Sequence, residues 1–204
     1  MAPEDRRAAI IAATIPLLRE HGLEVSTRQI AAAAGVAEGT VFGVFKDKNS
    51  LIVAALVDAI DPQPTIDAMA AIDPGLGLRE RLARAADLVI ERFAVHAQLL
   101  ASARKLILGG SDPETIARMT TSRERLLDAL TRVIEPNAGE LRRSPEAAAR
   151  LLLLFCGATA FGPFGDSGSV DGSEMASLLL DGLLIIPAGG EPLVVPLFGK
   201  TDKC

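Results

Sequence analysis

Few side chains in this sequence suit catalysis, whereas several suit a phosphate or a base edge. The chain of 204 residues has two histidines, His21 and His96, and two cysteines, Cys156 and Cys204. Their spacing fits no metal site, and no Ser/His/Asp order, paired carboxylates or phosphate-binding loop accompanies them. The sequence therefore predicts no enzyme, no metal and no cofactor, with Cys156 a buried, inert thiol.

Polar side chains that suit a nucleic acid gather between residues 26 and 48. Thr27 and Arg28 open one predicted helix, Thr40 lies in the next, and Lys46 and Lys48 follow. Free N–H groups at a helix start and cationic side chains bind phosphates, and hydroxyl or guanidinium groups also reach base edges. The alternative for each residue is a helix cap or a solvated surface position.

Two short helices joined by a tight turn position these side chains. Ser26 and Gln29 form a predicted capping box, which starts a helix over 27–34 that ends at Gly35. A second short helix spans 37 to about 45. This pattern is typical of a helix-turn-helix, whose second helix enters the major groove of DNA.

The rest of the chain also has helical periodicity, so the sequence predicts an all-α protein. A helix over 6–21, with Pro16 at a solvent-facing kink, precedes the two short helices. We expect a helix-turn-helix domain over 1–50, a connecting helix over about 47–60, a larger helical domain over 62–187 and a loose tail over 188–204. The further helices expected are 65–72, 78–96, 98–108, 113–134, 145–161 and 173–186.

Composition limits where the protein acts. The net charge is −5, and the acidic excess lies entirely after Ser50, so the first fifty residues are neutral. The acidic net charge argues weakly against nucleic-acid binding, and the neutral N-terminal segment modifies that argument. Hydrophobic residues make up 49% of the chain, yet no apolar run reaches the roughly 18 residues that span a bilayer. The high hydrophobic content indicates a buried interface between subunits. We expect a cytoplasmic protein, because the N-terminus lacks a basic-then-apolar secretion signal.

Residues Ile10 to Leu51 resemble the N-terminal domain of the TetR family of bacterial repressors. Gly35-Val36 followed by Gly39-Thr40, Phe45 and Lys48 is the most specific part. The other matching residues are Ala13, Leu17, Glu20-His21-Gly22, Thr27-Arg28-Gln29-Ile30-Ala31, Ala33-Ala34 and Val41-Phe42.

The resemblance implies a homodimer that places its third helix in the major groove of a palindromic DNA operator. A small molecule bound in the C-terminal domain would release the operator, and helices 145–161 and 173–186 would form the dimer. The implied DNA-binding residues are Thr27, Arg28, Glu38, Gly39, Thr40, Phe42, Lys46 and Lys48.

Four residues depart from the family's pattern. Phe42 and Val44 stand where an aromatic hydroxyl and a hydrogen-bonding ring are common, and Ala37 replaces a frequent serine cap. Glu38 is repelled by phosphate unless it faces a cytosine amino group. Phe42 suits either a thymine methyl group or packing, and Phe45 is assigned to the core. We therefore expect modest, salt-sensitive operator affinity. The alternative is a helical dimeric binding module that has lost specific DNA binding.

Seven residues of the C-terminal region are candidates for a ligand pocket. They are Phe93, His96, Leu100, Arg104, Met119, Phe155 and Phe161, and ordinary core packing is the alternative for each. The chain has no Tyr and no Trp. A pocket here would hold an apolar effector mainly through aliphatic side chains and phenylalanines.

Overall fold

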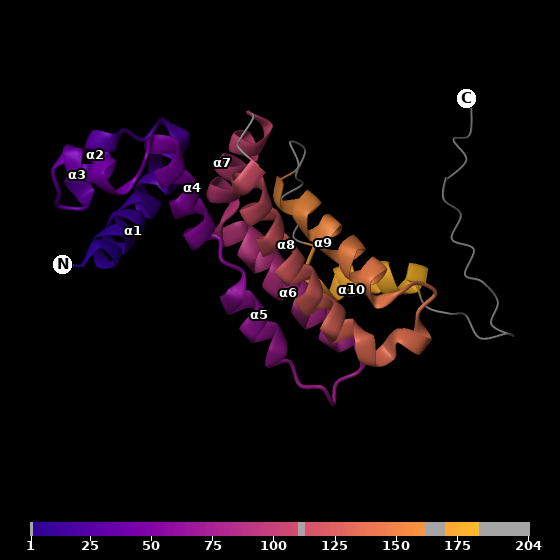
Figure 1. The fold of residues 1–204 in the computed structure, drawn as a ribbon. Coiled ribbons are helices and arrows are strands. Elements are labelled where there is room, and N and C mark those ends of the chain that lie inside the picture. The colour runs from indigo at the N-terminus through magenta and orange to yellow at the C-terminus, as the bar shows by residue number, and fades with distance from the viewer. Residues whose placement is uncertain (1, 110–112, 162–169, 184–204) are drawn as a thin grey trace, which may run out of the picture.

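The computed structural model describes residues 2–109, 113–161 and 170–183, and all regular elements in these ranges are helices (Figure 1). The predicted all-α fold class is confirmed. The α-helices are α1 (Pro3–His21), α2 (Thr27–Ala33), α3 (Glu38–Val44), α4 (Lys48–Ala59), α5 (Gln63–Ala70), α6 (Leu78–Val95), α7 (Ala97–Leu108), α8 (Pro113–Ile134), α9 (Pro145–Phe161) and α10 (Gly172–Leu183), with 3-10 helices η1 (Gly22–Glu24) and η2 (Glu135–Glu140).

Helices α1 to α4 form a compact head at one end of the molecule (Figure 1). α1 ends at Gly22, whose φ of 57° lies in the left-handed region that favours glycine. The helix continues through Pro16, which is exposed, so the ring meets solvent as expected. The head has its own apolar core, whose fully buried members include Ile10, Leu18, Ile30, Leu51, Ile52 and Leu56.

The junction between α4 and α5 differs from the predicted break. α5 begins at Gln63, two residues before the expected start, and Pro64 lies in its first turn. Proline is tolerated there because the first-turn N–H groups have no partner within the helix. The prolines at this junction therefore start a helix and do not merely interrupt one.

Helices α5 to α10 form the larger body, which has a second apolar core. α9 and α10 lie together on one side of it, and α10 also packs along α6 (Figure 1). Cys156 on α9 is buried, and desolvation raises the pKa of its thiol to about 12, which keeps it protonated and unreactive. The expected helix over 173–186 is observed as Gly172–Leu183, and its last three residues, the tail over 188–204 and Cys204 lie outside the described residues.

Helix α7 joins the two parts. Its Leu99 and Ala103 are buried in the head core, although α7 follows α6 of the body directly. His96 stands between α6 and α7 and ends one helix as the other begins. The head therefore rests on the body through α7 as well as through α4.

Candidate nucleic-acid interface and body pocket

The α2–α3 unit is built by local hydrogen bonds, as predicted. The Gln29 N–H donates to Ser26 Oγ at 3.2 Å, and the Ser26 N–H donates to Gln29 Oε1 at 2.8 Å. Gly35, with φ of 66°, makes the turn that follows α2. Ile30 and Val41 are buried beneath the two helices, which leaves their other faces open to solvent.

Most of the predicted DNA-binding side chains lie on the outer surface of the head. Arg28, Glu38 and Lys46 are exposed, as is Gly39. Phe42 is 52% exposed, so it does not belong to the core, whereas Phe45 is 3% exposed and does, as predicted. Thr27, Thr40 and Lys48 are half-buried, and Thr27 and Lys48 form hydrogen bonds within the protein.

Thr27 and Glu38 bind each other. The Thr27 hydroxyl donates to Glu38 Oε1 at 2.5 Å and so links the start of α2 to the start of α3. The carboxylate lies at the N-terminus of α3, where the helix dipole favours negative charge. This bond connects the two helices, and Glu38 keeps its negative charge because the hydroxyl donor is neutral. Sequence reasoning treated the two residues separately and missed the pair.

Lys48 uses one of its hydrogen-bond donors within the protein. Its Nζ donates to the backbone carbonyl of Leu23 in η1 at 3.0 Å, and the side chain is half-buried. An ammonium group has three donors, so two remain for a phosphate. Thr40 is half-buried on α3, and Lys46 stays exposed just before α4.

The start of α4 is fixed by a second capping box. Asp47 Oδ1 accepts from the Ser50 N–H at 2.7 Å, and this hydrogen bond is the main reason that the pKa of Asp47 is lowered. Arg7 of α1 lies over the Phe45 ring, 4.4 Å from its centroid. Such cation–π contacts hold α1 against the segment that follows α3. Arg7 is a positioning residue that the sequence did not single out.

A cavity of about 620 Å³ lies in the body between α6, α7, α8 and α9. Its lining combines a mainly apolar wall with arginine side chains and no carboxylate. The lining residues are Ile60, Arg92, Phe93, Leu100, Ala103, Arg104, Ile107, Ser122, Arg123, Leu126, Leu153, Leu154, Gly157 and Ala158. We call this the α6–α9 pocket.

The structure places three predicted pocket residues, Phe93, Leu100 and Arg104, in the α6–α9 pocket. His96 and Phe155 do not line it, and Phe155 is 51% exposed on α9. The side chains of Met119 and Phe161 lie outside the described residues. Phe155 is exposed because Leu152 and Cys156, one helical turn apart, occupy the buried face of α9.

Arg92 connects the α6–α9 pocket to the head. Its side chain is 9% exposed, and its guanidinium donates to the carbonyl of Asp61 at 3.0 Å and to that of Ile60. These bonds hold the chain just after α4. Burial lowers the pKa of Arg92, an effect that Asp61 opposes. Sequence reasoning did not select this residue, since its partners lie about 30 positions away.

A second arginine supports the same junction from α8. Arg125 donates through Nη1 to Asp61 Oδ1 at 2.9 Å and through Nη2 to Gln63 Oε1 at 2.5 Å. The pair is partly exposed, so the contribution of this ion pair to stability is modest. Together, Arg92 and Arg125 fix the α4–α5 junction to the body.

An apolar face remains uncovered on α9 and α10. Phe155 and Leu178 are 51% and 66% exposed, and Leu151 is 37% exposed. Exposed apolar patches of this kind mark interaction surfaces.

Within the described residues, no group of three or more His, Cys, Asp or Glu side chains is placed to hold a metal ion. No described helix has the length and hydropathy needed to cross a bilayer.

The head contains a helix-turn-helix and the body is helical, and one segment of the chain matches a known family model. Residues 10–55 match the model described as "Bacterial regulatory proteins, tetR family". The predicted resemblance of the N-terminal region to this family is confirmed over these residues. No curated protein sequence matches the chain.

Solved structures share this fold over most of the chain. A putative TetR-family transcriptional regulator from Mesorhizobium loti is 19% identical, covers 91% of this chain and 100% of its own, and has a TM-score of 0.72. A TetR-family regulatory protein from Rhodococcus RHA1 is 25% identical over 86% of this chain and 93% of its own, with a TM-score of 0.60. The Bacillus subtilis regulator FadR, solved with stearoyl-CoA, is 21% identical over 85% of this chain and 95% of its own, with a TM-score of 0.59.

Proposed function

We propose that this protein is a ligand-responsive transcription regulator that binds a palindromic DNA operator as a homodimer. The observation that carries the proposal is the α2–turn–α3 unit, which lies within the segment that matches the family model. It contains exposed Arg28 and half-buried Thr40, and exposed Lys46 follows it. α3 would enter the major groove, and the cationic side chains would bind the flanking phosphates. The role is that of a repressor without catalytic activity, in the cytoplasm.

The proposal keeps the predicted division of the chain. Residues 1–50 would bind DNA, α4 would transmit the signal, 62–187 would bind effector and partner, and 188–204 would be a tail. The two apolar cores support a boundary near the α4–α5 junction. The exposed Phe155 and Leu178 support a dimer formed by α9 and α10, since burying such side chains drives subunit association.

A small hydrophobic molecule in the α6–α9 pocket would release the operator. The pocket volume of about 620 Å³ is that of a typical small-molecule site. Ile60 and Arg92 line the pocket and also form the end of α4 and its anchor. A ligand that displaces Arg92 would therefore free α4 to change the spacing of the two heads. The FadR complex with stearoyl-CoA provides one example of a similar fold with an acyl ligand.

A gel-shift assay with the DNA upstream of the protein's own gene tests this proposal. The chain should retard this fragment and not a scrambled one. Arg28→Ala combined with Thr40→Ala should abolish the specific shift while leaving the dimer intact in size-exclusion chromatography with light scattering. Arg84→Ala, an exposed arginine of the body, is the matched control and should bind as the wild type does.

One observation favours a second candidate function, a helical dimeric binding module without specific DNA binding. Thr27, Glu38 and Lys48 are all engaged inside the head, so three of the predicted contact side chains already have partners. In that case the protein would bind the upstream fragment and the scrambled fragment equally weakly. The double variant would leave the affinity for both fragments unchanged.

A further inference from the structure

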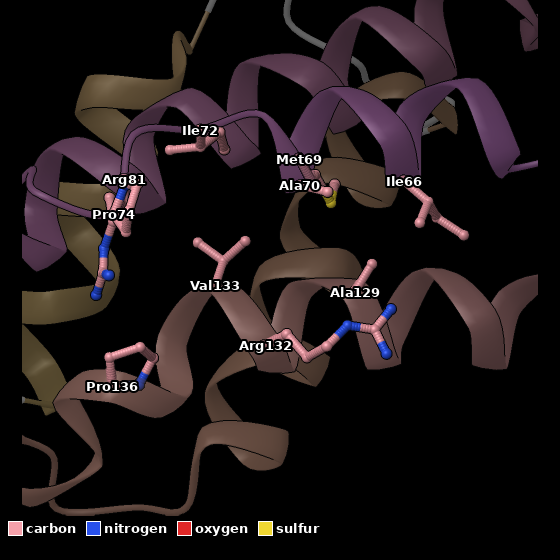
Figure 2. A pocket seen from close by; sticks show the side chains of 10 residues that line it. All are labelled: Ile66, Met69, Ala70, Ile72, Pro74, Arg81, Ala129, Arg132, Val133 and Pro136. Carbon is pink, nitrogen blue, oxygen red and sulfur yellow. The ribbon is translucent and has the colours of Figure 1, made fainter.

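A second cavity, separate from the α6–α9 pocket, lies in the body. It has a volume of about 260 Å³ and is formed by α5, the α5–α6 loop, α6, α8 and η2 (Figure 2). It shares no lining residue with the α6–α9 pocket. We call it the α5–α8 pocket.

The α5–α8 pocket contains a buried cation without a counter-charge. Arg81 of α6 is 5% exposed, and its side chain extends past Pro74 toward Pro136 (Figure 2). One guanidinium nitrogen donates to the Asn137 side-chain oxygen, whereas Nε is shielded from solvent and has no acceptor among the described residues. No described carboxylate forms an ion pair with Arg81.

A buried guanidinium in this state is energetically costly. Removing a charge from water costs several kcal/mol unless an opposite charge and hydrogen bonds replace the lost solvation. The nearest acid in this network is Glu140, which accepts from Asn137 Nδ2 at 2.5 Å and so reaches Arg81 only through a neutral amide. An anion in the pocket would supply both the missing charge and the missing acceptor.

The rest of the lining limits the kind of anion. Arg132 of α8 is exposed and points to the opposite end of the pocket from Arg81 (Figure 2). The other eight lining side chains are apolar, and they include Ile66, Met69 and Val133. An apolar wall with a cation at each end suits an organic anion and disfavours a fully hydrated inorganic one.

The volume indicates the size of a ligand that the pocket can hold. At about 30 Å³ for each water molecule of liquid, the pocket has the volume of roughly nine water molecules. A ligand with about nine to twelve non-hydrogen atoms fits this space. Benzoate, phenylacetate and octanoate fall in this range.

We propose that the α5–α8 pocket is a second ligand site, which binds a small organic monocarboxylate with Arg81 as the partner of its carboxylate. The site does not depend on the proposed DNA binding or on an effector in the α6–α9 pocket. Its occupant is an aromatic or aliphatic acid whose apolar part contacts α5 and α8.

Isothermal titration calorimetry on the full chain tests this site with benzoate, phenylacetate and octanoate, and with benzamide and inorganic phosphate as comparison ligands. At least one carboxylate should bind, and benzamide should bind at least tenfold more weakly than benzoate if benzoate is a ligand. Phosphate should bind more weakly than the best carboxylate. Binding of none of the three carboxylates, or equal binding of benzoate and benzamide, would overturn the proposal.

Three variants locate the binding. Arg81→Met replaces the guanidinium with an apolar side chain of similar length. It should lower the affinity for the best-binding carboxylate at least tenfold. Arg84→Met, one turn along α6 and exposed, should leave the affinity within twofold. Ala70→Phe fills the pocket from its exposed rim and should also abolish binding while Arg81 is retained. Wild-type affinity in Arg81→Met or in Ala70→Phe, each with an intact circular-dichroism spectrum, would contradict the assignment.

Discussion

Local hydrogen bonds start helices α2 and α4 of the head, whereas arginines of the body reach partners that are remote along the chain. In the head, Ser26 pairs with Gln29 and Asp47 with Ser50, each three residues apart. In the body, Arg92 reaches Ile60, Arg81 reaches Asn137 and Arg79 reaches Asp181, across 32, 56 and 102 positions. Local bonds form as a helix forms, whereas remote bonds need the finished fold. The two regions should therefore respond differently to loss of one polar group or one glycine.

The largest effect is expected where the two regions meet. Arg92→Met removes the donors that satisfy the Ile60 and Asp61 carbonyls, so two acceptors at the end of α4 lose their partners. Buried unsatisfied groups and lost charged hydrogen bonds lower the free energy of unfolding by about 3 kcal/mol. Urea denaturation measures this change. Arg84→Met removes only an exposed pair with Glu80 and should cost less than about 0.5 kcal/mol. Equal losses in the two variants would contradict the assigned role of Arg92.

A slightly smaller effect is expected at the contact between α10 and α6. Gly172 is buried, its N–H donates to Asp87 Oδ1 at 2.6 Å, and a methyl group added there would overlap the Ala83 carbonyl oxygen. Gly172→Ala should lower the free energy of unfolding by about 1–3 kcal/mol through overpacking. In Gly157→Ala, the added methyl group meets the Phe93 ring at 3.8 Å, an ordinary contact. Thermal denaturation should therefore separate the two variants, and the same Tm in both would rule out the close approach.

In the head, glycine is needed for conformation and not for space. Gly35 has φ of 66°, and nothing lies within 4 Å of an added Cβ. Gly35→Ala should cost about 1 kcal/mol, because side chains other than glycine are disfavoured in the left-handed region. Gly43→Ala, in α3 and equally open, should be neutral or stabilising, since alanine favours the helix. Chemical denaturation measures the free energy of unfolding of both variants. If Gly35→Ala stabilises the protein, Gly35 is not required for its left-handed conformation, and the contrast with the space requirement at Gly172 is wrong.

The smallest effect concerns pH and His96. Burial, followed by the charges of Arg92 and Arg19, lowers the pKa of His96, and its Nδ1 has no partner among the described residues. The unfolded chain therefore takes up a proton near pH 6.5 that the folded chain does not. The stability that neutral His96 contributes is present above that pH and is lost as the pH falls through it. His96→Gln should flatten the dependence of the free energy of unfolding on pH between about 7 and 5.5, and an unchanged slope would contradict this.

These contrasts also explain what could be predicted from sequence. The capping box of Ser26, the turn at Gly35 and the buried Phe45 follow from local spacing, and the structure has all three. The bonds from Thr27 to Glu38 and from Lys48 to Leu23 connect separate elements of the head, and no local pattern encodes them.

The body shows the same limit more strongly. Helical periodicity gives its helices to within a few residues. Periodicity does not identify which face of α9 points inward. The sequence analysis predicts Phe155 in a pocket, whereas Cys156 and Leu152 are the buried residues. Arg81 and Arg92 read as ordinary charged residues of an amphipathic helix, and only the fold shows that both are buried. Sequence patterns therefore predict the elements, and packing determines which polar side chains line the cavities.

The most direct test of DNA binding by the α2–α3 surface is a fluorescence anisotropy titration of the full chain on its own upstream DNA. The titration is run with wild type and with the Arg28→Ala, Thr40→Ala double variant, between about 50 and 200 mM salt. The proposal predicts binding that is specific for the upstream fragment, weakens steeply with salt and is lost in the double variant. Equal affinity of the wild type for upstream and scrambled DNA at the lowest salt would contradict it.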